Sequence, residues 1–188
     1  MRCVPEHRFT VAKALAWRSA IDDSPSYQRP ADRWSAEQRG RFIDSLLNGY
    51  DVPKLYFHDL RGIEPIRVYA VIDGKQRLNA IWDFAADRFP LAPDFRLEAD
   101  PDPSTTGSAP PRAGQTWSEL APAWQRAFLR TDLSVVLVQR ATEADIDALF
   151  FRLNDGVPLT AEERRGRLAT AADRRNAREP GAVAAGSR

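Results

Sequence analysis

The strand–turn–helix pattern of residues 66–87 constrains the fold more than any other stretch of the sequence. Residues 66–72 (IRVYAVI) are mostly apolar at both alternating positions, which is typical of a strand in the interior of a sheet. Asp73-Gly74 breaks this run, and residues 75–87 then carry Leu78, Ile81 and Trp82 at helical spacing. An interior strand that turns directly into an amphipathic helix requires a sheet with helices packed against it.

Helices and short strands alternate irregularly on both sides of this unit. We expect an α/β (α+β) fold, built on a small mixed sheet with surrounding helices rather than on a doubly wound sheet. The expected helices are 10–18, 35–48, 120–129 and 142–153, and the expected strands are 54–59, 133–138 and a short one at 95–97.

Two stretches are expected to lie outside the packed core. Residues 90–116 contain six prolines and a run of Ser, Thr and Gly, which predicts a surface insertion that is mobile at about 98–114. A capping box at Thr160 opens an Arg-rich segment, which Pro180 ends at the latest. The sequence therefore predicts one domain over residues 1–168 and an Arg- and Ala-rich tail over 169–188, disordered at its end.

Composition excludes several classes of protein. No apolar run approaches the ~18 residues of a membrane-spanning helix, and the N-terminus lacks the apolar stretch of a secretory signal. The single cysteine, Cys3, excludes a disulfide framework and indicates a reducing, cytoplasmic compartment. The sequence has one cysteine and two histidines, His7 and His58, which are too few ligands for an ordinary zinc site. Among metals, only an ion with oxygen ligands such as Mg²⁺ remains.

The most informative functional pattern is Asp73-Gly74-Lys75-Gln76-Arg77, at the predicted turn from strand to helix. The first amides of a helix lack intrahelical partners and lie at the positive end of its dipole, so they can bind an anion. Lys75 and Arg77 add two cations where the dipole disfavours them, which indicates an anionic ligand. Gly74 allows close approach of the backbone, and Asp73 is a candidate for holding Mg²⁺ or positioning a water. The alternative is an Asp-Gly turn followed by solvated basic side chains.

A second pattern is Tyr27-Gln28-Arg29, followed by Trp34, in a stretch expected to be extended. An aromatic ring next to Arg in such a segment can stack on a base while the guanidinium binds a phosphate. The alternative is a structural loop in which Trp34 packs on the helix that follows.

A third pattern lies at the end of the predicted helix 142–153. Arg152 and Asn154 lie off its apolar stripe, where they can reach a ligand. The alternative is a connection between two helices with Asn at the end of the first.

Three blocks of sequence together resemble a known family. In order, they are Tyr27-Gln28-Arg29 with Trp34, then Asp73 to Leu78, then Phe151 to Gly156 with Leu159-Thr160 and Glu163. This set resembles the N-terminal domain of GmrSD-type restriction endonucleases, a family grouped with ParB/sulfiredoxin-like domains, and it covers about residues 8–168. The resemblance implies a ParB-like α/β fold and a nucleotide-binding site, hydrolytic in several members, centred on an Asp-Gly-Gln-Gln-Arg motif.

The resemblance assigns roles to residues of this sequence. The candidate catalytic residues are Asp73, Gln76 and Arg77, and the expected ligands are a nucleoside triphosphate and Mg²⁺ at Asp73. Lys75 stands where the family usually has Gln, which adds a positive charge to the turn. The implied nucleotide-binding residues are Gly74, Lys75, Tyr27, Gln28, Arg29, Trp34, Arg152 and Asn154.

The sequence thus predicts a nucleotide-binding module of a restriction or anti-phage system, with NTP hydrolysis left open. Relatives usually continue into an HNH-type nuclease domain, whose chemistry needs a histidine near metal ligands. Neither His7 nor His58 has that context, so we expect a separate nuclease subunit as a partner. The alternatives are a non-enzymatic DNA- or partner-binding ParB-like module, in which the Arg-rich segment 161–178 contacts phosphates, and a truncated fragment of a larger restriction enzyme.

Overall fold

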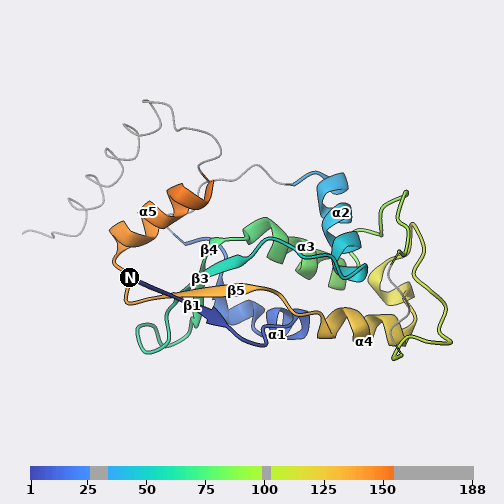
Figure 1. Cartoon of the computed structure of the whole chain (residues 1–188), viewed down its shortest axis with the longest axis horizontal. Helices are drawn as coiled ribbons and strands as arrows, with labels where there is room; N and C mark the ends of the chain where they lie inside the picture. The colour runs from blue at the N-terminus through green and yellow to red at the C-terminus, as the bar shows by residue number, and fades with distance from the viewer. Residues whose placement is uncertain (26–33, 99–102, 155–188) are drawn as a thin grey trace, which may run out of the picture. The chain divides into compact units, whose positions relative to one another are not determined.

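A mixed sheet lies at the centre of the fold (Figure 1). The computed structural model describes residues 1–25, 34–98 and 103–154. Within these ranges five strands pair in the order β1-β5-β3-β4-β2, with β4 antiparallel to β3 and parallel to β2. This arrangement confirms the expected small α/β fold. The strands are β1 (Arg2–Glu6), β2 (Ile21–Asp22), β3 (Leu55–Asp59), β4 (Tyr69–Asp73) and β5 (Val135–Gln139).

Five α-helices accompany the sheet in the described ranges, and none of these is long and apolar enough to cross a membrane. The chain divides into two compact units, Met1–Phe150 and Phe151–Arg188, and the site described below lies in the first. The helices are α1 (Val11–Ala16), α2 (Ala36–Leu47), α3 (Lys75–Ala85), α4 (Pro122–Arg130) and α5 (Glu143–Asn154), with short 3₁₀ turns at Arg18–Ala20 and Trp117–Glu119.

Polar side chains begin three of these helices where the sequence predicts it. Thr10 caps α1 through its side-chain oxygen. At α2, Ser35 Oγ accepts from the Gln38 amide and Gln38 Oε1 accepts from the Ser35 amide, at 3.2 and 2.8 Å. Thr142 and Asp145 make the same reciprocal pair at α5. Each pair satisfies amides that the helix itself leaves without a partner.

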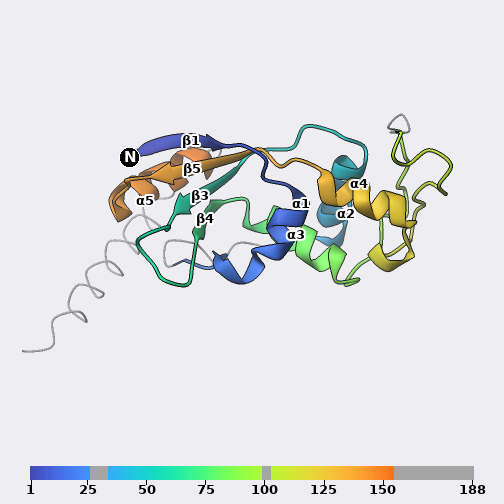
Figure 2. The same cartoon turned by 90° about the horizontal axis from the view of Figure 1, so that it is seen from below.

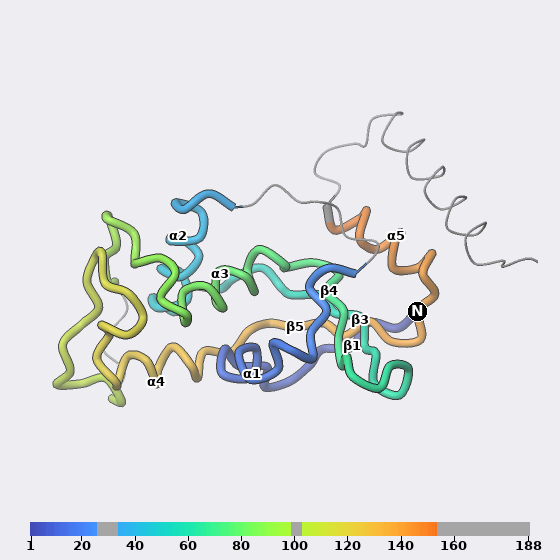
Figure 3. Tube along the Cα trace, turned by 180° about the vertical axis from the view of Figure 1, so that it is seen from behind, coloured from blue at the N-terminus to red at the C-terminus, as the bar shows by residue number. Residues whose placement is uncertain are grey.

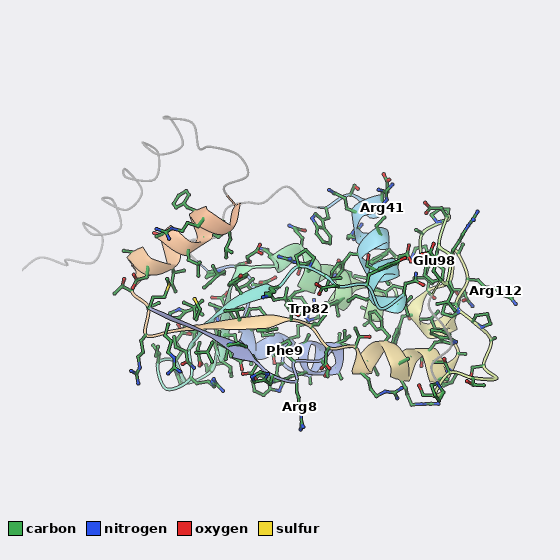
Figure 4. All side chains as sticks on the ribbon, in the orientation of Figure 1. Arg8, Phe9, Arg41, Trp82, Glu98 and Arg112 are labelled. Atoms are coloured by element: carbon green, nitrogen blue, oxygen red, sulfur yellow. The ribbon has the colours of Figure 1, made fainter. Side chains whose placement is uncertain are left out.

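Aromatic side chains fill the space between the sheet and helices α1 and α3, which lie side by side (Figure 2). Phe57 stacks on Tyr69 with ring centroids 5.4 Å apart, and Phe9 meets Phe57 edge-on. Trp82 Nε1 donates to the Ala14 carbonyl at 3.0 Å and joins α3 to α1. Phe9 and Trp82, both labelled in Figure 4, are at most 3% exposed. This packing fixes α3, and therefore the turn at its start, against the sheet.

Three strand predictions differ from the structure. The expected strand 66–72 begins only at Tyr69, because the loop before it leaves Ile66 79% exposed. Residues 95–97 are not a strand; Phe95 is buried as a loop residue instead. The edge strand Arg2–Glu6 is not predicted, since three of its five residues are exposed and its short run shows no clear alternation.

The two ends of the Pro-rich insertion are hydrogen-bonded to each other. The Leu91 amide donates to the Gln115 carbonyl at 2.8 Å, and the Gly114 amide donates to the Leu91 carbonyl at 3.1 Å. Its mobility at about 98–114 stays a prediction, and residues 99–102 lie outside the described ranges. The domain boundary at 168, the segment opened by Thr160 and the tail 169–188 also lie outside them.

Candidate functional site

Gly74 forms the turn between β4 and α3, which can be followed from behind in Figure 3. Its backbone is left-handed, with φ 103° and ψ 12°. A Cβ at this position would collide with Cδ2 of Leu55, which is itself only 3% exposed. Both the dihedral angle and the lack of space require glycine, so the chain passes from a buried strand into a helix within one residue.

Helix α3 begins without a side-chain cap, unlike α1 and α2. Its first turn contains Lys75, Gln76 and Arg77 and no acidic residue. The amides of such a turn have no intrahelical acceptor and lie at the positive end of the helix dipole. The start of α3 therefore has the uncapped amides and the basic residues on which the anion-binding prediction depends, and anion binding itself stays a prediction.

Arg77 lies back against β4 and pairs with Asp73. Arg77 Nη2 donates to Asp73 Oδ2 at 2.5 Å, and the two side chains are 10% and 29% exposed. Among the described residues, Asp73 is the only hydrogen-bond partner of the Arg77 side chain. The structure brings these two predicted site residues together, but it neutralises each with the other instead of leaving both open to a ligand.

Arg77 also lines a mainly apolar hollow with Phe42, Leu55 and Ile81 among its other walls. The hollow is closely packed and leaves essentially no room for a water-sized guest. Pockets that enclose small ligands usually reach roughly 300–1,000 Å³. A nucleotide bound to α3 would therefore lie at the exposed start of the helix and not in this hollow.

The side chains of Lys75 and Gln76 make contacts with two separate parts of the chain. Lys75 Nζ donates to Ser24 Oγ at 2.9 Å. The Trp34 amide donates to Gln76 Oε1 at 3.3 Å. These contacts bring the ends of the stretch that carries the Tyr-Gln-Arg block to the first turn of α3.

Trp34 packs against α2. Its ring meets Phe42 edge-on at 5.5 Å, and it is partly buried against the core. This contact supports the packing role that the sequence offers as an alternative for Trp34. Stacking of Trp34 on a base stays a prediction.

Several predicted site residues are not placed at this turn. Tyr27, Gln28 and Arg29 lie outside the described ranges. Arg152 is exposed near the end of α5 and belongs to the second unit, together with Asn154. Their part in the site stays a prediction.

A metal ion at Asp73 also stays a prediction. In the part of the chain that the structure describes, no group of three or more His, Cys, Asp or Glu side chains lies together as a metal site. Mg²⁺ bound with a nucleotide usually takes one or two carboxylates together with the phosphates. Asp73 fits that pattern if it exchanges its bond to Arg77 for the ion.

Ser24 is a contact residue of the site that sequence reasoning missed. Its amide donates to Asp22 Oδ1 and its hydroxyl donates to Asp23 Oδ1, both at 3.1 Å. Its bond to Lys75 joins residues 51 positions apart in the sequence. No local pattern could have indicated such a contact, although Ser24 closely precedes the Tyr-Gln-Arg block.

Among the described residues, the acid with the largest pKa shift lies away from this turn. Hydrogen bonds from Arg61 lower the pKa of Asp59 to about 2, and Gln139 Nε2 donates to the same carboxylate at 2.9 Å. Asp59 pairs with Tyr69 at the beginning of β4, whereas Asp73 is at its end. The pKa shift therefore reports mainly the local pair of Asp59 with Arg61, with a smaller contribution from Gln139 of β5, and not a group of the candidate site.

These features define a class: a small α/β module in which an interior strand ends at an uncapped, positively charged helix start. Residues 17–168 match the model of the family described as GmrSD restriction endonuclease, N-terminal domain. Because the match spans most of the chain, the chain belongs to this family, as the three sequence blocks predict. The family places the chain with modules of restriction and defence systems. No curated protein and no solved structure matches the chain.

Proposed function

We propose that this chain binds a nucleoside triphosphate at the start of α3, as the nucleotide-binding module of a restriction or anti-phage defence system. The observation that carries the proposal is the uncapped first turn of α3, with Lys75 in it and no acidic residue. A cation at a helix N-terminus costs stability unless an anion binds beside it. The family supplies the restriction context and the expectation of a nucleotide.

The phosphates would bind to the amides of residues 75–77 and to the Lys75 ammonium. Lys75 uses one donor on Ser24, and an ammonium group has three. Arg77 is held beside the same turn by Asp73, and its charge becomes available to a phosphate that displaces the Asp73 carboxylate. Phosphate binding at a helix start in this way needs neither an enclosed pocket nor a Gly-rich loop.

The base would be bound by the Tyr-Gln-Arg block. The resemblance assigns Tyr27 to stacking and Arg29 to a second phosphate contact, with Gln28 beside them. The bonds of Ser24 and Trp34 to α3 support this assignment, because they keep both ends of that stretch near the phosphate-binding turn. Hydrolysis of the nucleotide is a further proposal, for which Asp73 is the candidate to hold Mg²⁺ or a water.

Calorimetric titration of the full chain with ATP, GTP and CTP tests the proposal. Lys75→Met keeps the alkyl chain and removes the charge, and we expect it to weaken binding about tenfold. Arg112→Met is the matched control, because Arg112 is an exposed cation in the insertion, away from α3. Absence of binding by the unmodified chain with all three nucleotides, or equal affinities for the two variants, would contradict the proposal.

The Arg-rich segment 161–178, on which the DNA-binding alternative depends, lies outside the described residues. That alternative and the separate nuclease partner remain predictions from the sequence.

A further inference from the structure

Tyr56 lies directly beside the turn at which β4 becomes α3. In the antiparallel pair of β3 and β4, its Cα partner is Asp73, the last residue of β4. Opposite residues of such a pair have Cβ atoms roughly 4.5–5.5 Å apart. Lys75 follows Asp73 by two residues, so the Cα atoms of these two are at most about 7 Å apart. The sheet therefore carries an aromatic side chain next to the amides of the proposed phosphate site.

The ring of Tyr56 lies on the less covered face of β3. Its neighbours along the strand, Leu55 and Phe57, are buried, whereas Tyr56 is half-buried. Because successive side chains of a strand point to opposite faces, Tyr56 is directed away from the core that Leu55 and Phe57 fill. Its Cα partner on β5, Val136, is half-buried as well. This part of the sheet is therefore open enough for a flat ligand to reach the Tyr56 ring.

The packing of the fold makes little use of this side chain. Within the described ranges, Tyr56 makes no side-chain hydrogen bond and no ring contact. The pairing of β3 with β4 also shifts by one residue between Tyr56 and Phe57, as in a β-bulge. Bulges redirect side chains and are frequent next to active sites. Both features favour a ligand-binding role for Tyr56 over a purely structural one.

Trp34, the other half-buried aromatic residue near this turn, is used differently. Its amide donates to Gln76 Oε1 in the first turn of α3, but its ring packs edge-on against Phe42 of α2. The Trp34 ring therefore contributes to the packing of a helix, whereas the Tyr56 ring is available to a ligand.

We propose that Tyr56 is the surface on which the base of the nucleotide stacks, while the phosphates bind at the start of α3. This inference rests on the proposed function and extends it to a residue outside the three sequence blocks. Aromatic side chains on a sheet face stack bases in RNA-binding modules, because every base has a π face. A purine has a larger face than a pyrimidine, so we expect Tyr56 to contribute more to the binding of ATP and GTP than to that of CTP.

Calorimetric titration of the full chain with ATP, GTP, CTP and inorganic triphosphate separates the role of the ring from that of the phosphate site. Tyr56→Leu removes the ring and keeps apolar bulk. We expect its affinity for ATP and GTP to fall about fivefold or more, with a smaller loss for CTP and none for inorganic triphosphate. Tyr56→Phe keeps the ring and should bind every ligand as the unmodified chain does. Tyr50→Leu is the matched control, because Tyr50 is an exposed tyrosine whose hydroxyl bonds Glu98.

The outcomes distinguish failure of the stacking role from failure of the proposed function. If Tyr56→Leu binds ATP and GTP as tightly as the unmodified chain does, the stacking role is wrong and the proposed function stands. An equal loss of affinity for inorganic triphosphate would show that Tyr56 supports the turn itself, which also overturns the stacking role. If the unmodified chain binds none of the three nucleotides, the proposed function fails and the stacking role fails with it.

Discussion

Arg77 Nη2 lies 2.5 Å from Asp73 Oδ2, so the last residue of β4 is bonded to the third residue of α3. The pair spans the glycine at which the strand becomes a helix. The Asp73 carboxylate is an anion within the protein, and it lies next to the amides and cations that we propose as a phosphate site. An external anion at this turn must therefore compete with Asp73 for Arg77.

This competition predicts the effect of neutralising Asp73. Asp73→Asn keeps the shape of the side chain and removes its charge, so Arg77 becomes available to a phosphate. We expect the affinity for inorganic triphosphate, titrated without divalent cations, to rise about three- to tenfold. Asp83→Asn is the control, because Asp83 lies on the same helix but pairs with Arg39 and Arg88. An Asp73→Asn affinity equal to or below that of the unmodified chain would contradict the competition.

Replacing Gly74 by alanine should destabilise the domain strongly. An alanine at this position must adopt a φ of about 103°, and its Cβ collides with Cδ2 of Leu55. Together, the strained backbone and the overpacking predict a loss of about 2–4 kcal/mol in the free energy of unfolding. Gly62→Ala is the control, because Gly62 also has a positive φ but no atom within 4 Å of the added carbon. Urea denaturation that gives equal losses for the two variants would show that the contact with Leu55 has no effect.

Replacing Tyr69 by phenylalanine should leave the domain as stable as before or stabilise it by up to about 1 kcal/mol. Tyr69 is fully buried, and its hydroxyl has no hydrogen-bond partner among the described residues. Burial also raises the pKa of this hydroxyl. The variant keeps the ring that stacks on Phe57 and Trp17 and removes only the unsatisfied group. Thermal unfolding that shows a loss of more than about 1 kcal/mol would mean that the hydroxyl is hydrogen-bonded in solution.

Acid should weaken the domain through Asp59. Hydrogen bonds from Arg61 lower the pKa of Asp59 from 3.8 to about 2, so the folded state favours the ionised carboxylate. The resulting stabilisation is fully present above pH 3.8 and is lost as the pH falls towards 2. It amounts to about 1 kcal/mol, because the Arg61 side chain is 49% exposed and solvent screens the pair.

Asp59→Asn tests this assignment by urea denaturation at several pH values. The asparagine does not titrate, so we expect its free energy of unfolding to fall less steeply than that of the unmodified chain between pH 4 and pH 2. Parallel curves for the two proteins over that interval would exclude Asp59 as the group responsible.

Local patterns were sufficient for most elements and for the centre of the site. Polar caps at Thr10, Ser35 and Thr142 mark helix starts that depend only on neighbouring residues. The turn from β4 to α3 is also indicated by neighbouring residues alone, namely the apolar run before Asp73 and the glycine after it. The short strands β1 and β2 depend on partners far along the chain, so their own residues carry little signal.

The sequence by itself determined the family, the α/β class and the helix start at which an anion can bind, because each depends on residues that are close together in the chain. Only the tertiary structure decided how the side chains of that turn are used. Asp73 holds Arg77, while Lys75 and Gln76 hold Ser24 and Trp34, which are more than 40 residues away. Such contacts depend on how the strands and helices pack, since packing alone brings the stretch after β2 and the start of α2 to the end of β4.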